Sequence, residues 1–369
     1  MTQSINEFRD ETFKCIRCGL CQVVCPIYAE LGSEPTVARG KVRLVKELIE
    51  GNLAVSPRLK EIMGLCLNCQ ACVANCPPMV HTDKLVLAAR AHITAQEGLP
   101  LPVKAALQSF LPSSNMQGFA AKMAYLYQAS GLQKIVRGSG IIKAVSKDMA
   151  NQESLMPKFA PRTFRSILAG RQLKKGGKIR VAYFLSCMTN MVNTALGEAV
   201  IDVLERHGCE VVVPADVQCC GTPHLAYGDT ETAKKLAAHN MKLLLETGAE
   251  VIVTDCATCG SALKEYGELL PEAADFAKKV RDVSEFLVDT LGVKAGQRPV
   301  EAVVTCHDPC HLNRAQGVKA QPREILKAIP GLVFREMPEA DRCCGGAGSF
   351  GMTHYDLSQR ILDRKLDNA

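Results

Sequence analysis

The chain has 369 residues, 18 cysteines, no tryptophan and a formal net charge of +6. This length allows two or three domains with a sizeable core, and no apolar run is long enough to span a membrane. Met1–Asp10 has no features of a signal peptide. So many cysteines without a secretion signal indicate metal or redox chemistry in a reducing, cytoplasmic compartment rather than a disulfide framework.

A run of cysteines at Cys15–Pro26 reads C-x2-C-x2-C-x3-C-P, and the same pattern recurs at Cys66–Pro77. In two-cluster ferredoxins the first three thiols of such a run hold one cluster and the fourth ligates the other. Structural zinc uses pairs of C-x2-C instead. We therefore predict two [4Fe–4S] clusters, the first held by Cys15, Cys18, Cys21 and Cys76, the second by Cys66, Cys69, Cys72 and Cys25.

The segment between the two runs predicts a helix, because apolar residues in 37–49 have helical spacing and Gly51 follows as a stop signal. The 40 residues between Cys25 and Cys66 are too many for a compact β-rich ferredoxin. We expect a helical ferredoxin-like domain over 1–98, with the cysteine runs in loops and at helix starts. Arg39 and Arg43 either donate hydrogen bonds near a cluster or line a solvated helix face.

Residues 99–177 form a basic segment without cysteine. Between Leu101 and Lys178 there are 13 Lys or Arg residues against 2 Asp or Glu. Residues 119–147 predict a helix broken at Gly138–Gly140. We expect a helical linker or arm that packs on the chain's own domains or on a partner. A second interpretation is peripheral contact with the inner face of a membrane, whereas no nucleic-acid recognition module accompanies the charge.

From Lys178 onward, strands expected at 179–185, 210–213 and 251–253 alternate with helices expected at 195–207 and 229–246. This alternation predicts a parallel sheet covered by helices, whose ligands gather at the carboxyl ends of the strands. Cys209 opens a strand and is expected to be a buried apolar thiol. The cysteines that follow the strands are Cys187, Cys219, Cys220, Cys256 and Cys259.

The pattern then repeats, with strands expected at 300–304 and 332–335 and a helix at 353–366. Cys310 is preferred over Cys306 as the counterpart of Cys187, and Cys343 and Cys344 form the second paired-cysteine turn. A third strand with its C-x2-C would fall past Ala369, so this copy is incomplete and its sheet edge is open or covered by a partner.

Smaller features of the C-terminal half have two interpretations each. His307 and His311 either ligate or relay protons, or they have turn and cap roles. Residues 345–351 are glycine-rich, but they do not follow the strand–glycine–helix layout of a nucleotide loop and are expected to wrap Cys343 and Cys344. Gly19 and Gly221 are expected to relieve crowding beside ligands.

The first copy spells C-x31-CCG followed by C-x2-C, and Cys306-His307-Asp308-Pro309-Cys310-His311-Leu312 belongs to the second. With the two N-terminal runs, this order resembles the iron–sulfur subunits of glycolate oxidase, D-lactate dehydrogenase and anaerobic glycerol-3-phosphate dehydrogenase, and the CCG domains of heterodisulfide reductases. The resemblance implies a multidomain α plus α/β protein: a ferredoxin-like domain, the arm, a first CCG module (178–299) and an incomplete second one (300–369).

The resemblance also implies an iron–sulfur electron-transfer subunit of a 2-hydroxy-acid oxidase or dehydrogenase. It would relay electrons from an FAD-containing subunit to a quinone or another carrier, since the chain offers no flavin or nicotinamide fold of its own. The alternatives are a thiol–disulfide reductase subunit of the heterodisulfide reductase type and the iron–sulfur subunit of an anaerobic glycerol-3-phosphate dehydrogenase. Cys187, Cys219, Cys220, Cys256 and Cys259 would hold an additional iron–sulfur cluster, zinc or free thiols being the other options. Cys310, Cys343 and Cys344 would form a possible, incomplete site.

Overall fold

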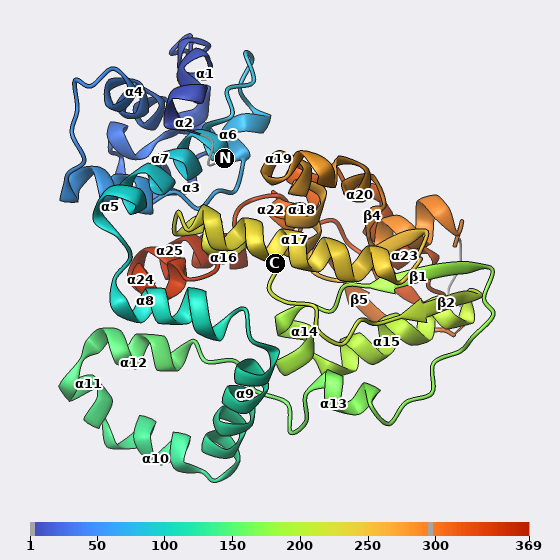
Figure 1. Ribbon diagram of the computed structural model, residues 1–369. Helices are drawn as coiled ribbons and strands as arrows, with labels where there is room; N and C mark the ends of the chain where they lie inside the picture. The colour runs from blue at the N-terminus through green and yellow to red at the C-terminus, as the bar shows by residue number, and fades with distance from the viewer. Residues whose placement is uncertain (1–3, 294–297, 369) are drawn as a thin grey trace.

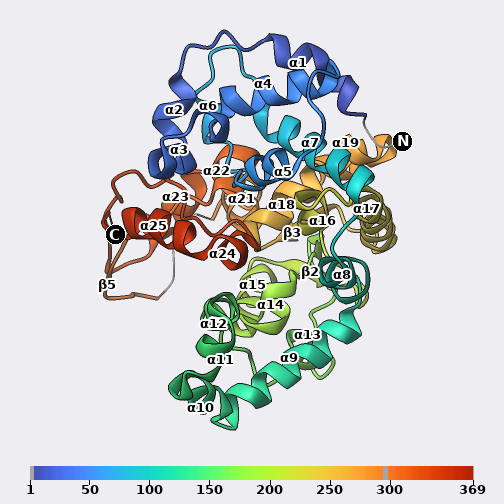
Figure 2. The ribbon, with the colours of Figure 1, turned by 90° about the vertical axis from the view of Figure 1, so that its left-hand side faces the viewer.

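The computed structural model describes residues 4–293 and 298–368. Three parts are visible in Figure 1: a helical N-terminal domain, an arm of helices, and α/β modules built on two parallel sheets. In both ribbon views the N-terminal helices lie at one end of the molecule and α10 of the arm at the opposite end (Figures 1 and 2). None of the helices in the described ranges is both long and apolar enough to cross a membrane.

Residues 4–98 contain helices and no strand, as expected for a helical ferredoxin-like domain. The predicted helix at 37–49 is α4, and its buried Val42 and Val45 pack with Leu85 and Val86 of α7. The elements are η1 (Ile5–Phe8), α1 (Arg9–Phe13), α2 (Leu20–Val24), α3 (Pro26–Leu31), η2 (Glu34–Thr36), α4 (Ala38–Ile49), α5 (Pro57–Gly64), α6 (Ala71–Ala74) and α7 (Thr82–Glu97).

The arm departs from its expected form at one point. The helix expected over 119–147 breaks at Gly140, as predicted, but also at Gly131, and both glycines have positive φ angles. A Ser-Gly pair is a turn signal, so this second break was readable from the sequence. The elements are α8 (Leu101–Ala105), the π-helical turn η3 (Ala106–Phe110), α9 (Ser114–Ala129), α10 (Leu132–Ser139), α11 (Ile141–Val145) and α12 (Lys147–Ser154).

The first CCG module is built on a parallel sheet of order β2-β1-β3-β4. Both faces of β1 are buried: Ala182 packs in the cluster on one face, while Val181 and Tyr183 pack on the other. Strands expected at 179–185, 210–213 and 251–253 are present as β1, β2 and β3. The strand β4 was missed, because three residues with one buried apolar side chain leave too little pattern.

The strands are β1 (Ile179–Tyr183), β2 (Cys209–Val212), β3 (Val251–Thr254) and β4 (Val280–Asp282). The helices are α13 (Phe164–Leu168), α14 (Cys187–Met191), α15 (Thr194–Arg206), α16 (Thr222–Ala226), α17 (Thr230–Glu246), α18 (Ala257–Lys264), α19 (Tyr266–Leu269), η4 (Pro271–Ala273), α20 (Ala274–Lys278), α21 (Val283–Glu285) and η5 (Phe286–Thr290).

The second module has a parallel pair, β5 (Ala302–Val304) and β6 (Leu332–Phe334), as expected. Val303 and Val333 are exposed on this small sheet. The helix expected at 353–366 is divided at His354 into α24 (Phe350–Thr353) and α25 (Tyr355–Leu366). The remaining helices are α22 (Cys310–Gln316) and α23 (Ala320–Ala328).

The two modules are joined where α18 lies against α22 (Figure 1). Gln316 donates its side-chain amide to the carbonyl of Ala257, at 2.8 Å. A Cβ atom at Gly260 would lie 2.8 Å from that same amide, so glycine is what allows this close approach. This joint places His311, the residue after Cys310, within electrostatic reach of Cys220 in the first module.

Candidate metal centres

Two cavities lie in the N-terminal domain, and each is lined by one predicted set of four cysteines. Cys15, Cys18 and Cys21 line the first cavity together with Cys76, the last cysteine of the other run. Cys66, Cys69 and Cys72 line the second cavity together with Cys25. Cys72 also reaches the first cavity. This exchange of the fourth cysteine is the arrangement that crossed ligation requires, although the ligand roles themselves remain predictions.

The backbone repeats between the two cysteine runs. Arg17 and Asn68 occupy equivalent positions and both have positive φ angles, of 58° and 51°. The next equivalent pair, Gly19 and Gln70, also has positive φ, and each residue is the N-cap of a short helix. When residues with left-handed backbone conformation alternate with right-handed ones, successive backbone N–H groups point into a shared concavity. Such concavities bind anions and occur at iron–sulfur sites. Glycine at position 19 adopts this conformation without the strain that Gln70 carries, and a Cβ atom there would also lie 3.1 Å from the guanidinium of Arg39.

The fourth cysteine of each run accepts a backbone hydrogen bond. Cys25 Sγ accepts from the N–H of Tyr28 at 3.5 Å, and Cys76 Sγ accepts from the N–H of Val80 at 3.4 Å. Burial raises the pKa of the Cys25 thiol to about 11. Metal coordination deprotonates such a thiol, and the backbone donor then stabilises the thiolate. An iron–sulfur cluster fits both cavities on these grounds.

The two arginines of α4 differ in their relation to the first cavity. Arg39 lines it, its side chain pairs with Glu34, and it donates a 3.4 Å hydrogen bond to the carbonyl of Arg17. Arg43 pairs with Glu47 on an exposed face. Of the two interpretations given above, Arg39 fits the first, since it lies near the cysteines, and Arg43 fits the second, since it lies on a solvated helix face.

Sequence reasoning missed a cation at the second cavity. Lys41, also on α4, is 2% exposed and lines the second cavity. Its ammonium donates to the carbonyl of Thr36, and no carboxylate in the described residues pairs with it. Burying an ammonium without a counter-ion is costly, so an anionic cluster in this cavity would compensate its charge. The signal available in the sequence was its position on the apolar face of α4.

The first CCG module gathers its five predicted cysteines at the carboxyl ends of the strands. Cys220 is hydrogen-bonded with Cys219 and with Cys259, and these bonds hold the pKa of the Cys220 thiol well below its usual value. Cys256 is hydrogen-bonded with Cys259, and Cys187 interacts electrostatically with Cys220 and Cys256. Cys209 lies apart, buried at the start of β2, as expected.

The paired-cysteine turn of this module is held by buried polar groups that the sequence analysis did not single out. Asn240 of α17 is fully buried, accepts from the N–H of Gln218 and donates to the carbonyl of Cys219 at 3.0 Å. Tyr266 donates its hydroxyl to the carbonyl of Cys220 at 3.1 Å. Gly221 follows with a φ of 92° and begins α16 as its N-cap. A buried asparagine on an otherwise apolar helix face was the available signal.

The second module places two of its cysteines, Cys310 and Cys343, beside Cys69, which lines the second cavity of the N-terminal domain. Cys343 is hydrogen-bonded with Cys310 and with Cys69, and these bonds raise its pKa. The same contact lowers the pKa of Cys69 to about 6. The sequence did not predict that a thiol of this module touches a predicted ligand of the second cluster. Cys344 follows Cys343 and is half-buried.

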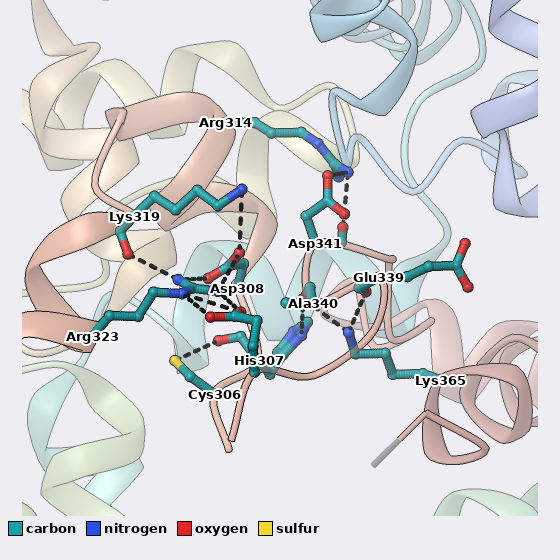
Figure 3. A network of polar contacts seen from close by, with 11 residues as sticks. Cys306, His307, Asp308, Arg314, Lys319, Arg323, Glu339, Ala340, Asp341 and Lys365 are labelled. Atoms are coloured by element: carbon teal, nitrogen blue, oxygen red, sulfur yellow. Dashed lines mark hydrogen bonds and ion pairs between the residues drawn. The ribbon is translucent and has the colours of Figure 1, made fainter. Parts of the chain in front are cut away.

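Cys306 points away from this group. Its thiol donates to the carbonyl of His307 and lies in a network centred on the buried carboxylate of Asp308 (Figure 3). Arg323 donates to both oxygens of Asp308, at 2.6 and 3.1 Å, which fixes the loop before Cys310. The preference for Cys310 over Cys306 agrees with this placement.

The two histidines beside Cys310 form hydrogen bonds that tie loops together. His307 Nδ1 contacts the carbonyl of Ala340 at 3.2 Å, and His311 Nδ1 contacts the hydroxyl of Thr258 at 3.1 Å. His311 therefore links the second module to α18 of the first. Of the interpretations given above, the structural one describes both contacts.

A further group missed from the sequence is Arg314, four residues after Cys310 on α22. It donates to the carbonyl of Cys69 at 3.2 Å and pairs with Asp341 at 2.9 Å. Its charge helps to lower the pKa of Cys69 and of Cys310, after the hydrogen bond from Cys343 in each case. Figure 3 shows Arg314 reaching Asp341 beside the Asp308 network. The residue thus connects the two cysteine sets.

Single-ion sites are a separate matter. In residues 4–293 and 298–368, no three His, Cys, Asp or Glu side chains have the arrangement of a site for one metal ion.

Three family models match separate parts of the chain. Residues 11–80 match the family described as a 4Fe-4S dicluster domain. Residues 181–264 and 304–369 match the family described as a cysteine-rich domain. Residues 101–156, most of the arm, match the linker region of the glycolate oxidase iron–sulfur subunit.

Known relatives extend over nearly the whole chain. A probable glycolate oxidase iron–sulfur subunit of Bacillus subtilis (strain 168) is 33% identical, with 99% of this chain and 87% of the relative covered. This chain belongs to the glycolate oxidase iron–sulfur subunit family. The Escherichia coli (strain K12) glycolate oxidase iron–sulfur subunit is 27% identical over 96% of this chain and 84% of its own. Lactate utilization protein A 2 of Bacillus mycoides (strain KBAB4) is 34% identical over 52% of this chain and 82% of its own.

The family assignment confirms the resemblance drawn from the sequence. It also confirms that the chain is an iron–sulfur protein of mixed helical and α/β architecture. The number and type of clusters, and the ligand of each, remain predictions. The domain boundaries drawn at 98, 177 and 299 remain proposals as well.

Proposed function

We propose that this chain is the electron-transfer subunit of a glycolate or D-lactate oxidase or dehydrogenase. It takes electrons from an FAD-containing partner subunit and passes them to a quinone or another carrier. The observation that carries the proposal is the series of contacting cysteine sets. The first cavity adjoins the second through Cys72, the second touches Cys343, and His311 links that module to the first CCG module.

Each bound cluster supplies one-electron chemistry, and the protein positions it and adjusts its potential. In this chain Cys15, Cys18, Cys21 and Cys76 would hold the first [4Fe–4S] cluster, and Cys25, Cys66, Cys69 and Cys72 the second. The additional iron–sulfur site would use the five cysteines of the first CCG module. Cys310, Cys343 and Cys344 offer three further thiols beside Cys69. Lys41 and Arg314 place positive charge next to the second cavity, where an added electron would be stabilised.

The arm supports a proposal on location. Leu132, Ile135, Ile141 and Val145 are exposed on α10 and α11, at the end of the molecule far from the N-terminal domain (Figure 2). The lysines among them make this a basic amphipathic surface, of the kind that binds anionic lipid. A cytoplasmic protein peripheral to the inner membrane face would use it, and sedimentation with anionic vesicles, compared with the Ile135→Asp variant, tests this.

A second candidate is a thiol–disulfide reductase, in which the first CCG module itself cleaves a disulfide. The specific observation in its favour is that five thiols meet there, more than one cubane needs. Reduced holoprotein that cleaves a disulfide without any flavin subunit would favour this second function.

The test of the first function uses the complex as it exists. The chain is tagged, purified anaerobically with its flavin-containing subunit, and mixed with glycolate or D-lactate. Paramagnetic signals of reduced clusters are expected to appear on substrate addition. The Cys18→Ala variant is expected to lose one signal while the flavin is still reduced, and Cys209→Ala is the matched control that keeps every signal. Substrate that reduces the flavin but never reduces this chain would contradict the relay.

A further inference from the structure

The two cysteine runs have the same pattern of backbone conformations, so residues at equivalent positions can be compared directly. Ile16 is equivalent to Leu67, and Leu20 is equivalent to Ala71. In the first run Ile16 is 65% and Leu20 is 47% exposed. In the second run Leu67 is 6% and Ala71 is 4% exposed. The same face of the same loop is therefore open in one copy and covered in the other.

The chain itself covers the second loop. Leu67 packs in a buried cluster with Phe350, Leu357 and Ile361 of the second CCG module. In the same place Cys69, the cysteine equivalent to Cys18, contacts Cys343. A cysteine loop of this type thus docks onto another cysteine-bearing surface through these very positions. Apolar side chains and cysteines of both sets pack in this one cluster.

The first loop presents the corresponding features to solvent. Cys18 is the one exposed cysteine of the 18, all of which lie in the described residues. Phe13 and Val23, on the helices that flank the loop, are exposed as well. Arg17 projects beside them without an ion pair in the part of the chain that the structure describes. The surface has an exposed thiol, apolar neighbours and an uncompensated positive charge.

We infer that Ile16, Cys18 and Leu20 form the docking face for the FAD-containing subunit with which this chain exchanges electrons. This inference rests on the proposed function and adds to it the place where electrons enter. The partner surface is expected to be apolar at its centre, as Phe350 and Ile361 are at the second loop. A carboxylate on its rim would complement Arg17.

The size of this face suits an electron-transfer contact. Weak redox encounters bury less than about 1,200 Å² in total, well below a stable dimer interface. A few exposed side chains around one loop are enough for such a contact. Because electron transfer weakens steeply with distance, an exposed sulfur such as that of Cys18 favours electron entry at the first predicted cluster.

The experiment uses the full, cluster-loaded chain and the flavin-containing subunit purified with it. Ile16→Asp and Leu20→Asp are compared with Leu196→Asp, which places the same charge at an exposed apolar position on α15, 44% exposed against 47% for Leu20. The measurement is the rate of cluster reduction by substrate-reduced flavin subunit, divided by the rate with dithionite. Iron content normalises each sample, and Ile16→Leu checks that an apolar residue suffices.

For Ile16→Asp and Leu20→Asp we expect this ratio to fall about tenfold or more, the effect of losing roughly 1.4 kcal/mol of binding. Ile16→Leu and Leu196→Asp should keep the wild-type ratio. An unchanged ratio in both loop variants overturns the inference, as does a fall in Leu196→Asp alone. Loss of self-association or of vesicle binding in the loop variants, with the ratio intact, would assign the face to a second copy or to a membrane. If the flavin subunit fails to reduce the wild-type chain, the proposed function itself fails.

Discussion

The two cysteine runs share a sequence pattern and a backbone, yet their surroundings are opposite. The first run lies at the surface, and the α4 arginine that lines its cavity, Arg39, is paired with Glu34. The second run lies between α4 and the second CCG module, with Arg314 bonded to Cys69 and Lys41 beside it, paired with no carboxylate among the described residues. The pattern determines the loop, whereas segments far away in the sequence determine its environment. Two clusters held by identical motifs are therefore expected to have different roles.

The largest expected difference concerns the loss of one cysteine from each run. Cys18→Ala and Cys69→Ala should each remove about four irons, the content of one cubane. Only Cys69→Ala also breaks a contact with Cys343, so it should additionally disturb the second CCG module. Iron analysis and cluster spectroscopy measure the first effect, and limited proteolysis of the C-terminal half measures the second. Equal proteolysis of the two variants would remove the distinction between the runs.

The next prediction compares how equivalent substitutions in the two loops change the free energy of unfolding. Leu67→Ala should destabilise the fold by about 2–5 kcal/mol, because it leaves a cavity between Phe350 and Ile361. Ile16→Ala, its equivalent in the first run, should change the free energy of unfolding by less than about 0.5 kcal/mol. Anaerobic denaturant unfolding of the loaded proteins compares them. A similar loss in both would mean that the first loop is covered in solution.

A smaller effect concerns the reduction potential of the second cluster. Arg314→Gln removes a positive charge from beside Cys69 and Cys310, so an added electron is less stabilised. We expect one cluster to become harder to reduce by on the order of 60 mV, the one-electron equivalent of a tenfold change. The matched control is Arg171→Gln, whose ion-pair partners are Asp202 and Glu205.

The measurement is a redox titration followed by the paramagnetic signals of the clusters. The potential of the first cluster should not move in Arg314→Gln. Arg39→Gln is the complementary variant, because Arg39 lines only the first cavity. If Arg314→Gln shifted the potentials of both clusters, the cause would be a general structural change and not the loss of a local charge.

Much of this fold could be read from local patterns. The strands β1 and β3 and the helix α17 were predicted because their apolar spacing is long and regular. The position of Cys76 at the first cavity and of Cys25 at the second was predicted from the cysteine pattern, whereas their ligand roles stay predictions. The strand β4 was not, because three residues carry no periodicity. Local information therefore gave the elements and the cysteine loops.

The missing information was about contacts between distant segments. Nothing in the sequence indicates that Cys69 and Cys343 are in contact. Arg314 likewise reaches Cys69 only because α22 packs on the second loop. The sequence shows Asn240 as a polar residue on the buried face of α17. Its hydrogen-bond partner, the carbonyl of Cys219, can be identified only in the folded structure. The relation between the two runs could not be predicted for the same reason.

The smallest expected effect tests the shared backbone directly. Gln70 has a φ of 57° at the position equivalent to Gly19, whose φ is 87°. A glycine at position 70 would remove the strain of the left-handed conformation, which costs the folded state about 1–2 kcal/mol. It would also give the unfolded chain more conformational freedom, which lowers the stability by about 0.4–1 kcal/mol. Gln70→Gly should thus stabilise the protein slightly.

Gly19→Ala should destabilise it, since the new methyl group would also lie 3.1 Å from Arg39. Thermal unfolding of the loaded proteins gives both signs in one experiment. If both substitutions destabilise to the same degree, the two loops do not share one backbone, and the comparison of Ile16 with Leu67 loses its basis.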